Sequence, residues 1–286
     1  MQTNVQHSRA ATANLMQIIA TDNTDIALIQ EPYIYQSRTA GITQGYRTYT
    51  YGDGKRRAAI IISNNTGDAL LLTQLSDNDT VLLEIRKGTT TFYAASIYMD
   101  FKDSIENSIK TIQKILEFTK GTKLIIAMDS NARSTTWYDM TTNHRGKLLE
   151  EFLASNQLHI INEESTRTSF HSSRGRSNID ITLTNNQMLA DINNWHILEE
   201  ESASDHSIIK FNIKFSNTDT KINIAYDPRY ITKEQQQTEF HEKLYHIITK
   251  TFQIKTQEGR EVDIDEELNR LLKGHTDIRK LTETLD

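Results

Sequence analysis

Short apolar runs bounded by polar residues recur along the first 215 residues, and they leave few folds open to the chain. Seven of these runs are rich in β-branched and aliphatic residues and have the length of a β-strand: 26–29, 58–63, 80–86, 91–98, 123–128, 179–184 and 207–215. Amphipathic patterns with helical spacing are fewer, at 10–20, 104–118 and 145–156. The sequence therefore predicts an α+β fold in which helices flank a two-sheet β-sandwich.

The character of the chain changes after Phe215. A polar connector that contains Asp227-Pro228 leads into two helical patterns, at about 232–251 and 262–285. The chain of 286 residues is long enough for one large domain and an appendage. We expect a globular domain over 1–215 and a helical connector over 216–286.

Composition excludes several classes of protein and site. No apolar run approaches the roughly eighteen residues of a membrane span, and no signal peptide is evident, so we expect a soluble protein without a membrane partner. The chain has no cysteine, so any metal must be held by oxygen or imidazole ligands. A formal charge of −6 argues against a surface that binds nucleic acid everywhere. The basic cluster Lys55-Arg56-Arg57 is either a local phosphate contact or a solvated loop.

Acidic and amide residues repeatedly stand where an apolar run ends or begins. The run 26–29 leads to Glu31, and the run 123–128 leads to Asp129 and Asn131. Asp180 lies at the start of the run 179–184, and His206 precedes the last run. If these ends meet at one edge, they supply what phosphodiester hydrolysis needs: ligands for Mg²⁺, a group to align water and donors for phosphoryl oxygens. Each residue alone is more often a turn or cap residue, so the argument depends on the four together.

The ordered motifs Gln30-Glu-Pro32, Asp129-Ser-Asn131, Ser177-Asn-Ile-Asp180 and Ser204-Asp-His206 resemble the endonuclease/exonuclease/phosphatase superfamily, which includes deoxyribonuclease I and apurinic endonucleases. The resemblance covers about 2–215. Within the superfamily, the chain is similar to endonucleases of non-LTR retrotransposons, especially site-specific arthropod elements, through the segments 4–11, 145–149, 158–162, 168–170 and 191–195. This implies a four-layer, deoxyribonuclease I-like sandwich. It also implies a Mg²⁺-dependent endonuclease, with Mn²⁺ as a substitute, that nicks double-stranded DNA and leaves a 3′-hydroxyl to prime reverse transcription.

The resemblance also implies individual roles. Glu31 would be the principal metal ligand, with Asn4 beside it and Asp205 assisting. Asp129 would align or deprotonate the attacking water, and Asn131 would hold a phosphoryl oxygen.

A second group of residues would act on the phosphate. His206 would stabilise the developing oxyanion, and Asp180 would orient the imidazole and raise its pKa. Tyr98 would contact the phosphate. Further phosphate or DNA contacts are expected from Thr168, Ser177 and Ser204, and from a turn that carries Arg174 and Arg176 into a DNA groove.

The resemblance places the chain in a longer polyprotein, with a reverse transcriptase as its partner and the nucleus as its site of action. Gln6 stands where repair-type relatives carry an acidic residue, which favours simple nicking over abasic-site repair. Met99-Asp100 follows the tyrosine where relatives have a small residue and a proline, which leaves the shape of that loop open. The alternatives are a superfamily phosphatase, which would need a membrane-facing loop or a basic pocket, and a catalytically idle DNA-targeting module.

Other conspicuous residues have ordinary interpretations. Trp137 is expected to pack the sandwich edge rather than stack on a base, and Trp195 is expected in the core. His7, His144 and His159 lack metal-like spacing and are left structural or solvated. A Ser/His/Asp hydrolase is rejected because the chain has no Gly-x-Ser-x-Gly motif.

Overall fold

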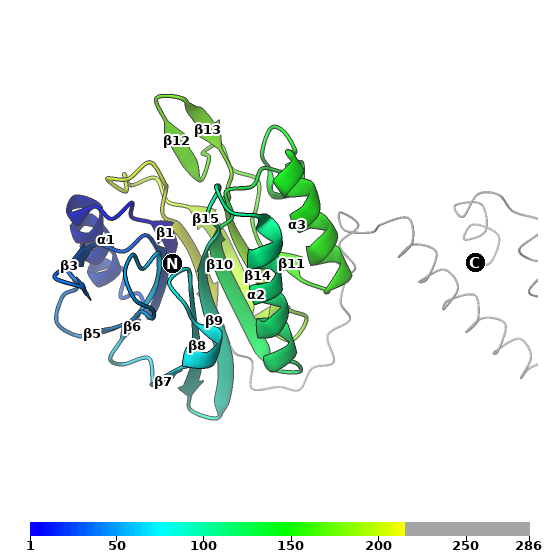
Figure 1. The fold of residues 1–286 in the computed structure, drawn as a ribbon. Helices are drawn as coiled ribbons and strands as arrows, with labels where there is room; N and C mark the ends of the chain where they lie inside the picture. Colours follow the sequence, from blue (N-terminus) through cyan, green and yellow to red (C-terminus); the bar gives the residue numbers. More distant parts are fainter. Residues whose placement is uncertain (215–286) are drawn as a thin grey trace, which may run out of the picture. The chain divides into compact units, whose positions relative to one another are not determined.

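Two six-stranded mixed sheets form the body of the computed structural model, which describes residues 1–214 (Figure 1). The first sheet has the order β15-β16-β1-β2-β6-β5, and its strands are β1 (Gln2–Asn4), β2 (Ile26–Gln30), β5 (Tyr46–Tyr49), β6 (Ala58–Ser63), β15 (Ile192–Ile197) and β16 (Ile209–Ile213). The second has the order β11-β14-β10-β9-β8-β7, and its strands are β7 (Asp68–Leu71), β8 (Thr80–Lys87), β9 (Thr90–Tyr98), β10 (Lys123–Asp129), β11 (His159–Ile160) and β14 (Asp180–Thr184). The predicted α+β sandwich is confirmed. The predicted helices beyond 215 lie outside the described residues.

Smaller elements complete the fold. Two hairpins stand apart from the main sheets: β3 (Ile34–Tyr35) with β4 (Arg38–Thr39), and β12 (Phe170–Ser172) with β13 (Gly175–Ser177). The helices are α1 (Arg9–Thr21), α2 (Ile105–Phe118) and α3 (His144–Ser155), with 3₁₀ turns η1 (Thr73–Leu75), η2 (Thr135–Trp137) and η3 (Leu189–Asp191). Helix α1 lies on one side of the sandwich, and α2 and α3 lie on the other (Figure 1). Within the described residues, no helix has the length and apolarity to cross a membrane.

Strand periodicity divides the first sheet between two apolar cores. Leu28, Ile60 and Ile62 point into the core between the sheets, while Ile29 and Ile61 point to the core beneath α1. Both faces of β2 and β6 are therefore buried, which explains why these strands read as continuous apolar runs. Trp195 lies in the core between the sheets and is 4% exposed, as predicted.

Side-chain caps define where two helices begin. Ser8 accepts a hydrogen bond from the backbone N–H of Ala11 at the start of α1. Asn143 accepts one from the N–H of Gly146 at the start of α3. Such caps satisfy backbone donors that the first helical turn leaves unpaired.

Strand register brings the polar residues at strand ends together. The parallel strands β9 and β10 pair Tyr98 with Asp129, and the antiparallel pair β10–β14 places Asp180 opposite Asp129. In the first sheet, the parallel strands β1 and β2 pair Asn4 with Gln30. Because parallel strands end at the same edge of a sheet, these residues collect at one rim of the sandwich.

The structure departs from the predicted elements chiefly at the sheet edges. Strands β5, β7, β11 and β15 are the four edge strands of the main sheets, and none was predicted. An edge strand is hydrogen-bonded on one side only and carries more polar residues, so its apolar pattern is weak. The last run was predicted too long, since β16 begins at Ile209 and the Ser207 N–H instead bonds the Ser169 carbonyl.

Candidate active site

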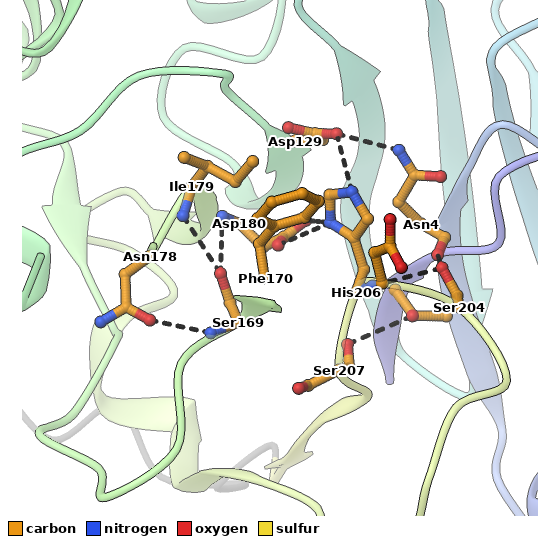
Figure 2. Close-up of polar contacts among 12 residues, drawn as sticks. Asn4, Asp129, Ser169, Phe170, Asn178, Ile179, Asp180, Ser204, His206 and Ser207 are labelled. Carbon is orange, nitrogen blue, oxygen red and sulfur yellow. Dashed lines mark hydrogen bonds and ion pairs between the residues drawn. The ribbon is translucent and has the colours of Figure 1, made fainter. Parts of the chain in front are cut away.

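Asp180, His206 and Asp129 form the centre of the rim (Figure 2). The Nδ1 atom of His206 lies 2.9 Å from Asp180 Oδ2, and Nε2 lies 3.7 Å from Asp129 Oδ2. All three residues are buried. Because a carboxylate accepts hydrogen bonds, Nδ1 carries a proton and Nε2 is turned toward Asp129. Burial lowers the pKa of His206, but the charges of Asp180 and Asp129 outweigh it and leave this pKa raised.

Asp129 is held in a fixed orientation at the end of β10. The Asn4 side chain donates from Nδ2 to Asp129 Oδ2 at 2.9 Å, and the backbone N–H of Asn131 donates to Oδ1 at 3.1 Å. Burial raises the pKa of Asp129, and the neighbouring charge of Asp180 adds to the rise. Asn131 is itself anchored, since its Nδ2 donates to the Met99 carbonyl at 2.9 Å.

Glu31 follows β2 in the left-handed backbone region, with a φ of 46°. Its side chain is 16% exposed and lies 3.4 Å from His7 Nε2 and 4.0 Å from Lys55 Nζ. Burial raises the pKa of Glu31, but the neighbouring side chains of His7, Asn4 and Lys55 bring it below its ordinary value. The contact with His7 was missed, because nothing in a local pattern relates position 7 to position 31.

Tyr98 lies at the end of β9, under the guanidinium of Arg57, which is 4.8 Å above its ring. Arg57 also pairs with the carboxylates of Asp79 and Asp100. The basic cluster at 55–57 therefore does not act as one phosphate-binding patch, because the charge of Arg57 is paired within the protein. The contact between Asp100 and Arg57 also joins the loop after Tyr98 to the neighbouring sheet. Burial, with the charges of Glu31 and other carboxylates, raises the pKa of Tyr98, so its phenol keeps the proton that it can donate.

Ser169 orients Asp180 from the segment 168–170, in which the sequence analysis gave a role only to Thr168. Its Oγ accepts hydrogen bonds from the backbone N–H groups of Ile179 and Asp180, at 3.1 Å each (Figure 2). The Asn178 side chain in turn accepts from the Ser169 N–H at 2.8 Å. The next residue, Phe170, sets its ring edge-on to the His206 imidazole, with centroids 4.9 Å apart. The only sequence signal was that these residues belong to the family motifs.

The predicted phosphate donors lie around this centre, and several are engaged within the protein. Ser204 Oγ donates to the Asn4 carbonyl at 2.8 Å, and Asp205 accepts from the Gln6 amide at 3.2 Å. Thr168 Oγ1 donates to the Phe170 carbonyl at 3.0 Å. Their contacts with phosphate, and that of the half-buried Ser177, stay predictions.

The predicted arginine turn is the hairpin of β12 and β13, which projects from the sandwich (Figure 1). Arg174 lies in its turn and Arg176 on β13, and both are exposed. The hairpin base carries Phe170, so it begins directly at the imidazole. Trp137, by contrast, is fully buried and donates from Nε1 to the carbonyls of Ala132 and Asn178, so it packs inside the domain as predicted.

A divalent cation fits the side of the rim that contains Glu31. Glu31 and Asp129 offer oxygen atoms, which Mg²⁺ prefers, and the lowered pKa keeps Glu31 ionised. Asn4 turns its Nδ2 to Asp129, and its Oδ1 accepts a hydrogen bond from the Gln6 N–H, so its part as a metal ligand stays a prediction. The charges of Glu31 and Asp129 both raise the pKa of Tyr98, which indicates that negative charge is concentrated near this phenol. Ligand atoms of Asp129, Asp180 and His206 also lie within 4.8 Å of one another. In that cluster, however, the Nδ1 atom of His206 is already hydrogen-bonded to Asp180.

Comparisons with known proteins agree with this geometry. A family model described as endonuclease-reverse transcriptase matches residues 92–210. The endonuclease domain of TRAS1, a telomere-specific non-LTR retrotransposon, is 32% identical, with a TM-score of 0.68, over 75% of this chain and 97% of that domain. An apurinic endonuclease from Leishmania major shares the fold at 10% identity, with a TM-score of 0.63, over 75% of this chain and 87% of that one.

Two retrotransposon proteins are similar in sequence. A 115 kDa protein in the type-1 element R1DM of Drosophila melanogaster is 26% identical over 219 residues, 73% of this chain. A retrovirus-related Pol polyprotein from the type-1 element R1 of Bradysia coprophila is 25% identical over 242 residues, 81% of this chain. This chain spans only 21% and 24% of the length of those two proteins.

Proposed function

Because the chain belongs to the endonuclease domains of non-LTR retrotransposons, within the endonuclease/exonuclease/phosphatase superfamily, we propose that it nicks double-stranded DNA with a divalent metal ion. The product would be a 3′-hydroxyl that primes reverse transcription and a 5′-phosphate on the other side of the nick. The observation that carries the proposal is the chain of contacts from Asp180 through His206 and Asp129 to Asn4, which pairs in strand register with Gln30, the residue before Glu31. Such a chain combines fixed donors with carboxylates at one point, as phosphodiester hydrolysis requires.

The proposed roles follow from the hydrogen bonds that orient each side chain. Asp129 is the group that aligns the attacking water, because Asn4 and Asn131 hold its carboxylate in place. His206 is the donor to the developing negative charge, since Asp180 fixes Nδ1 and leaves Nε2 to act. A cation bound at Glu31 would neutralise charge on the phosphate, with Mg²⁺ as the expected ion and Mn²⁺ as a substitute.

Groups around the centre would position the DNA. The phenol of Tyr98 keeps its proton and can donate to a phosphoryl oxygen. Arg174 and Arg176 project on a hairpin that starts at the imidazole, and they would enter a groove beside the cut phosphate. Asn131, Thr168, Ser177, Ser204 and Asp205 complete the proposed phosphate and metal contacts.

A nicking assay tests the proposal. The full chain is incubated with supercoiled plasmid, with Mg²⁺ or with a chelator in its place, and relaxed circles are measured. The proposal expects relaxed circles only with the metal. DNA ligase should reseal the nicks, because it joins only a 3′-hydroxyl to a 5′-phosphate. Metal-independent nicking, nicks that ligase cannot join, or no nicking at all would contradict it, and the last result would favour an idle targeting module.

We further propose that the reverse transcriptase of the same polyprotein is the functional partner and that the nucleus is the site of action. The short span of this chain along its retrotransposon relatives supports the first part. A 3′-hydroxyl made by one domain can be extended without release if the polymerase is tethered nearby, because tethering raises the effective concentration.

A further inference from the structure

His7 is fixed against the residues around Glu31 by two hydrogen bonds. Its backbone N–H donates to the Glu31 carbonyl at 2.7 Å, and its Nδ1 atom lies 2.9 Å from the Pro32 carbonyl. The residue also has a left-handed backbone, with a φ of 52°. The imidazole therefore has one orientation, with Nε2 toward the Glu31 carboxylate.

The protonation of the ring follows from these partners. A carbonyl oxygen only accepts hydrogen bonds, so Nδ1 carries the proton of the neutral ring, and Nε2 presents a lone pair. This Nε2 atom is buried without a hydrogen-bond partner among the described residues, and it lies 3.4 Å from Glu31 Oε1. A lone pair and a carboxylate oxygen that face one another are satisfied together when a cation binds between them.

The distance suits that arrangement. Two ligand atoms that bind one ion at about 2.1 Å and at right angles lie about 3 Å apart. A histidine that ligates a metal also donates its other N–H to a carboxylate or backbone carbonyl, as His7 does to Pro32.

We propose that Nε2 of His7 is a ligand of the cation that Glu31 binds, which makes this a mixed nitrogen and oxygen site. The inference rests on the proposed function. Mg²⁺ prefers oxygen ligands, whereas a nitrogen ligand favours transition metals. The site should therefore bind Mn²⁺ more tightly than Mg²⁺ by a larger ratio than an all-oxygen site would.

Neighbouring groups do not offer the same contact. Gln6 is turned away, since its side chain pairs with Asp205. His206 uses Nδ1 for Asp180 and points Nε2 at Asp129. Lys55 lies 4.0 Å from Glu31 on a side chain that is 68% exposed.

Pulsed electron paramagnetic resonance of Mn²⁺ bound to the full chain tests the proposal, because the echo is modulated by an imidazole nitrogen that ligates the ion. The test variant is His7→Asn, since asparagine tolerates the left-handed backbone. His206→Asn removes the other imidazole of the rim, which is buried. His196→Asn, on the exposed edge strand β15, is the matched control.

The proposal expects nitrogen modulation in the native chain, in His206→Asn and in His196→Asn, and none in His7→Asn. Calorimetric titration should show that His7→Asn loses about tenfold or more in Mn²⁺ affinity and much less in Mg²⁺ affinity. Circular dichroism checks that the variant is folded, and an unfolded His7→Asn is replaced by His7→Gln for the same measurement.

Three results would overturn the proposal: Mn²⁺ binding without nitrogen modulation in the native chain, modulation that survives in the folded His7 variant, or no Mn²⁺ binding. The first two would leave His7 as an ion-pair partner of Glu31. Neither depends on cleavage, so the plasmid assay separately decides whether the chain is a nuclease.

Discussion

Ser169→Ala removes the hydroxyl that positions the start of β14. In the native chain, this Oγ accepts hydrogen bonds from the backbone N–H groups of Ile179 and Asp180 at 3.1 Å each, in a residue that is 1% exposed. Alanine offers no acceptor there. Both N–H groups would be buried and unpaired, and Asp180, which orients His206, would lose one of its anchors.

The expected cost follows from those two donors. An unsatisfied buried donor costs about 1–3 kcal/mol, so the loss of both acceptor contacts should cost about 2–6 kcal/mol of the free energy of unfolding. For a domain of this size, each kcal/mol lowers the Tm by about 2–4 °C, so the Tm should fall by about 4–24 °C. Nicking, measured at a temperature where the variant is folded, should also fall by about tenfold or more, because small displacements of a catalytic group are costly.

Urea unfolding followed by circular dichroism measures the first effect, and plasmid nicking measures the second. Ser173→Ala is the matched control, since Ser173 is exposed in the turn of the hairpin, and its change should stay within about 0.5 kcal/mol. If Ser169→Ala unfolds at the same urea concentration as Ser173→Ala, the hydroxyl is not the acceptor that holds these backbone groups. Full stability with lost nicking would equally refute the link between the two effects.

Three further outcomes are expected. Glu31→Ala and His206→Ala should each reduce nicking by about a hundredfold or more without unfolding the domain, since each removes charge stabilisation rather than core volume; a folded variant that keeps over about a tenth of the native rate would contradict the assignment. A chain that ends at residue 216 should still nick plasmid, because every proposed catalytic group lies earlier in the sequence; a folded but inactive truncation would place the boundary elsewhere. Replacing Arg174 and Arg176 together by alanine should weaken DNA binding and reduce its salt dependence by up to about two phosphate contacts. It should also redistribute the nick positions on a labelled duplex, with a much smaller effect on turnover. If the nick positions and the salt dependence are both unchanged, the hairpin is only a solvated loop.

The inner strands were predictable and the edge strands were not. Runs such as 58–63 and 123–128 are apolar because both faces of these strands are buried. The local sequence is therefore enough to predict them as buried strands. Strand β5, with the sequence Tyr-Arg-Thr-Tyr, is half-buried along its length. Its strand character comes from pairing with β6, and that pairing is not visible in four residues.

The candidate site divides in the same way. Carboxylates and amides at strand ends were recognisable, because their position relative to an apolar run is a local property. The role of His7 was missed, since its contact with Glu31 joins two turns that are far apart in sequence. Arg57 was grouped with its basic neighbours, whereas its charge is taken up by Asp79 and Asp100.

The sequence by itself determined which residues could serve the chemistry, because side-chain type and strand periodicity are properties of short segments. Only the tertiary structure decided their partners. Asn4 and Asp129 are 125 residues apart and lie 2.9 Å from one another, because separate strand registers bring the two sheet edges to one rim. Hydrogen bonds act over a few ångströms, so the site exists only where long-range strand pairing has closed those distances.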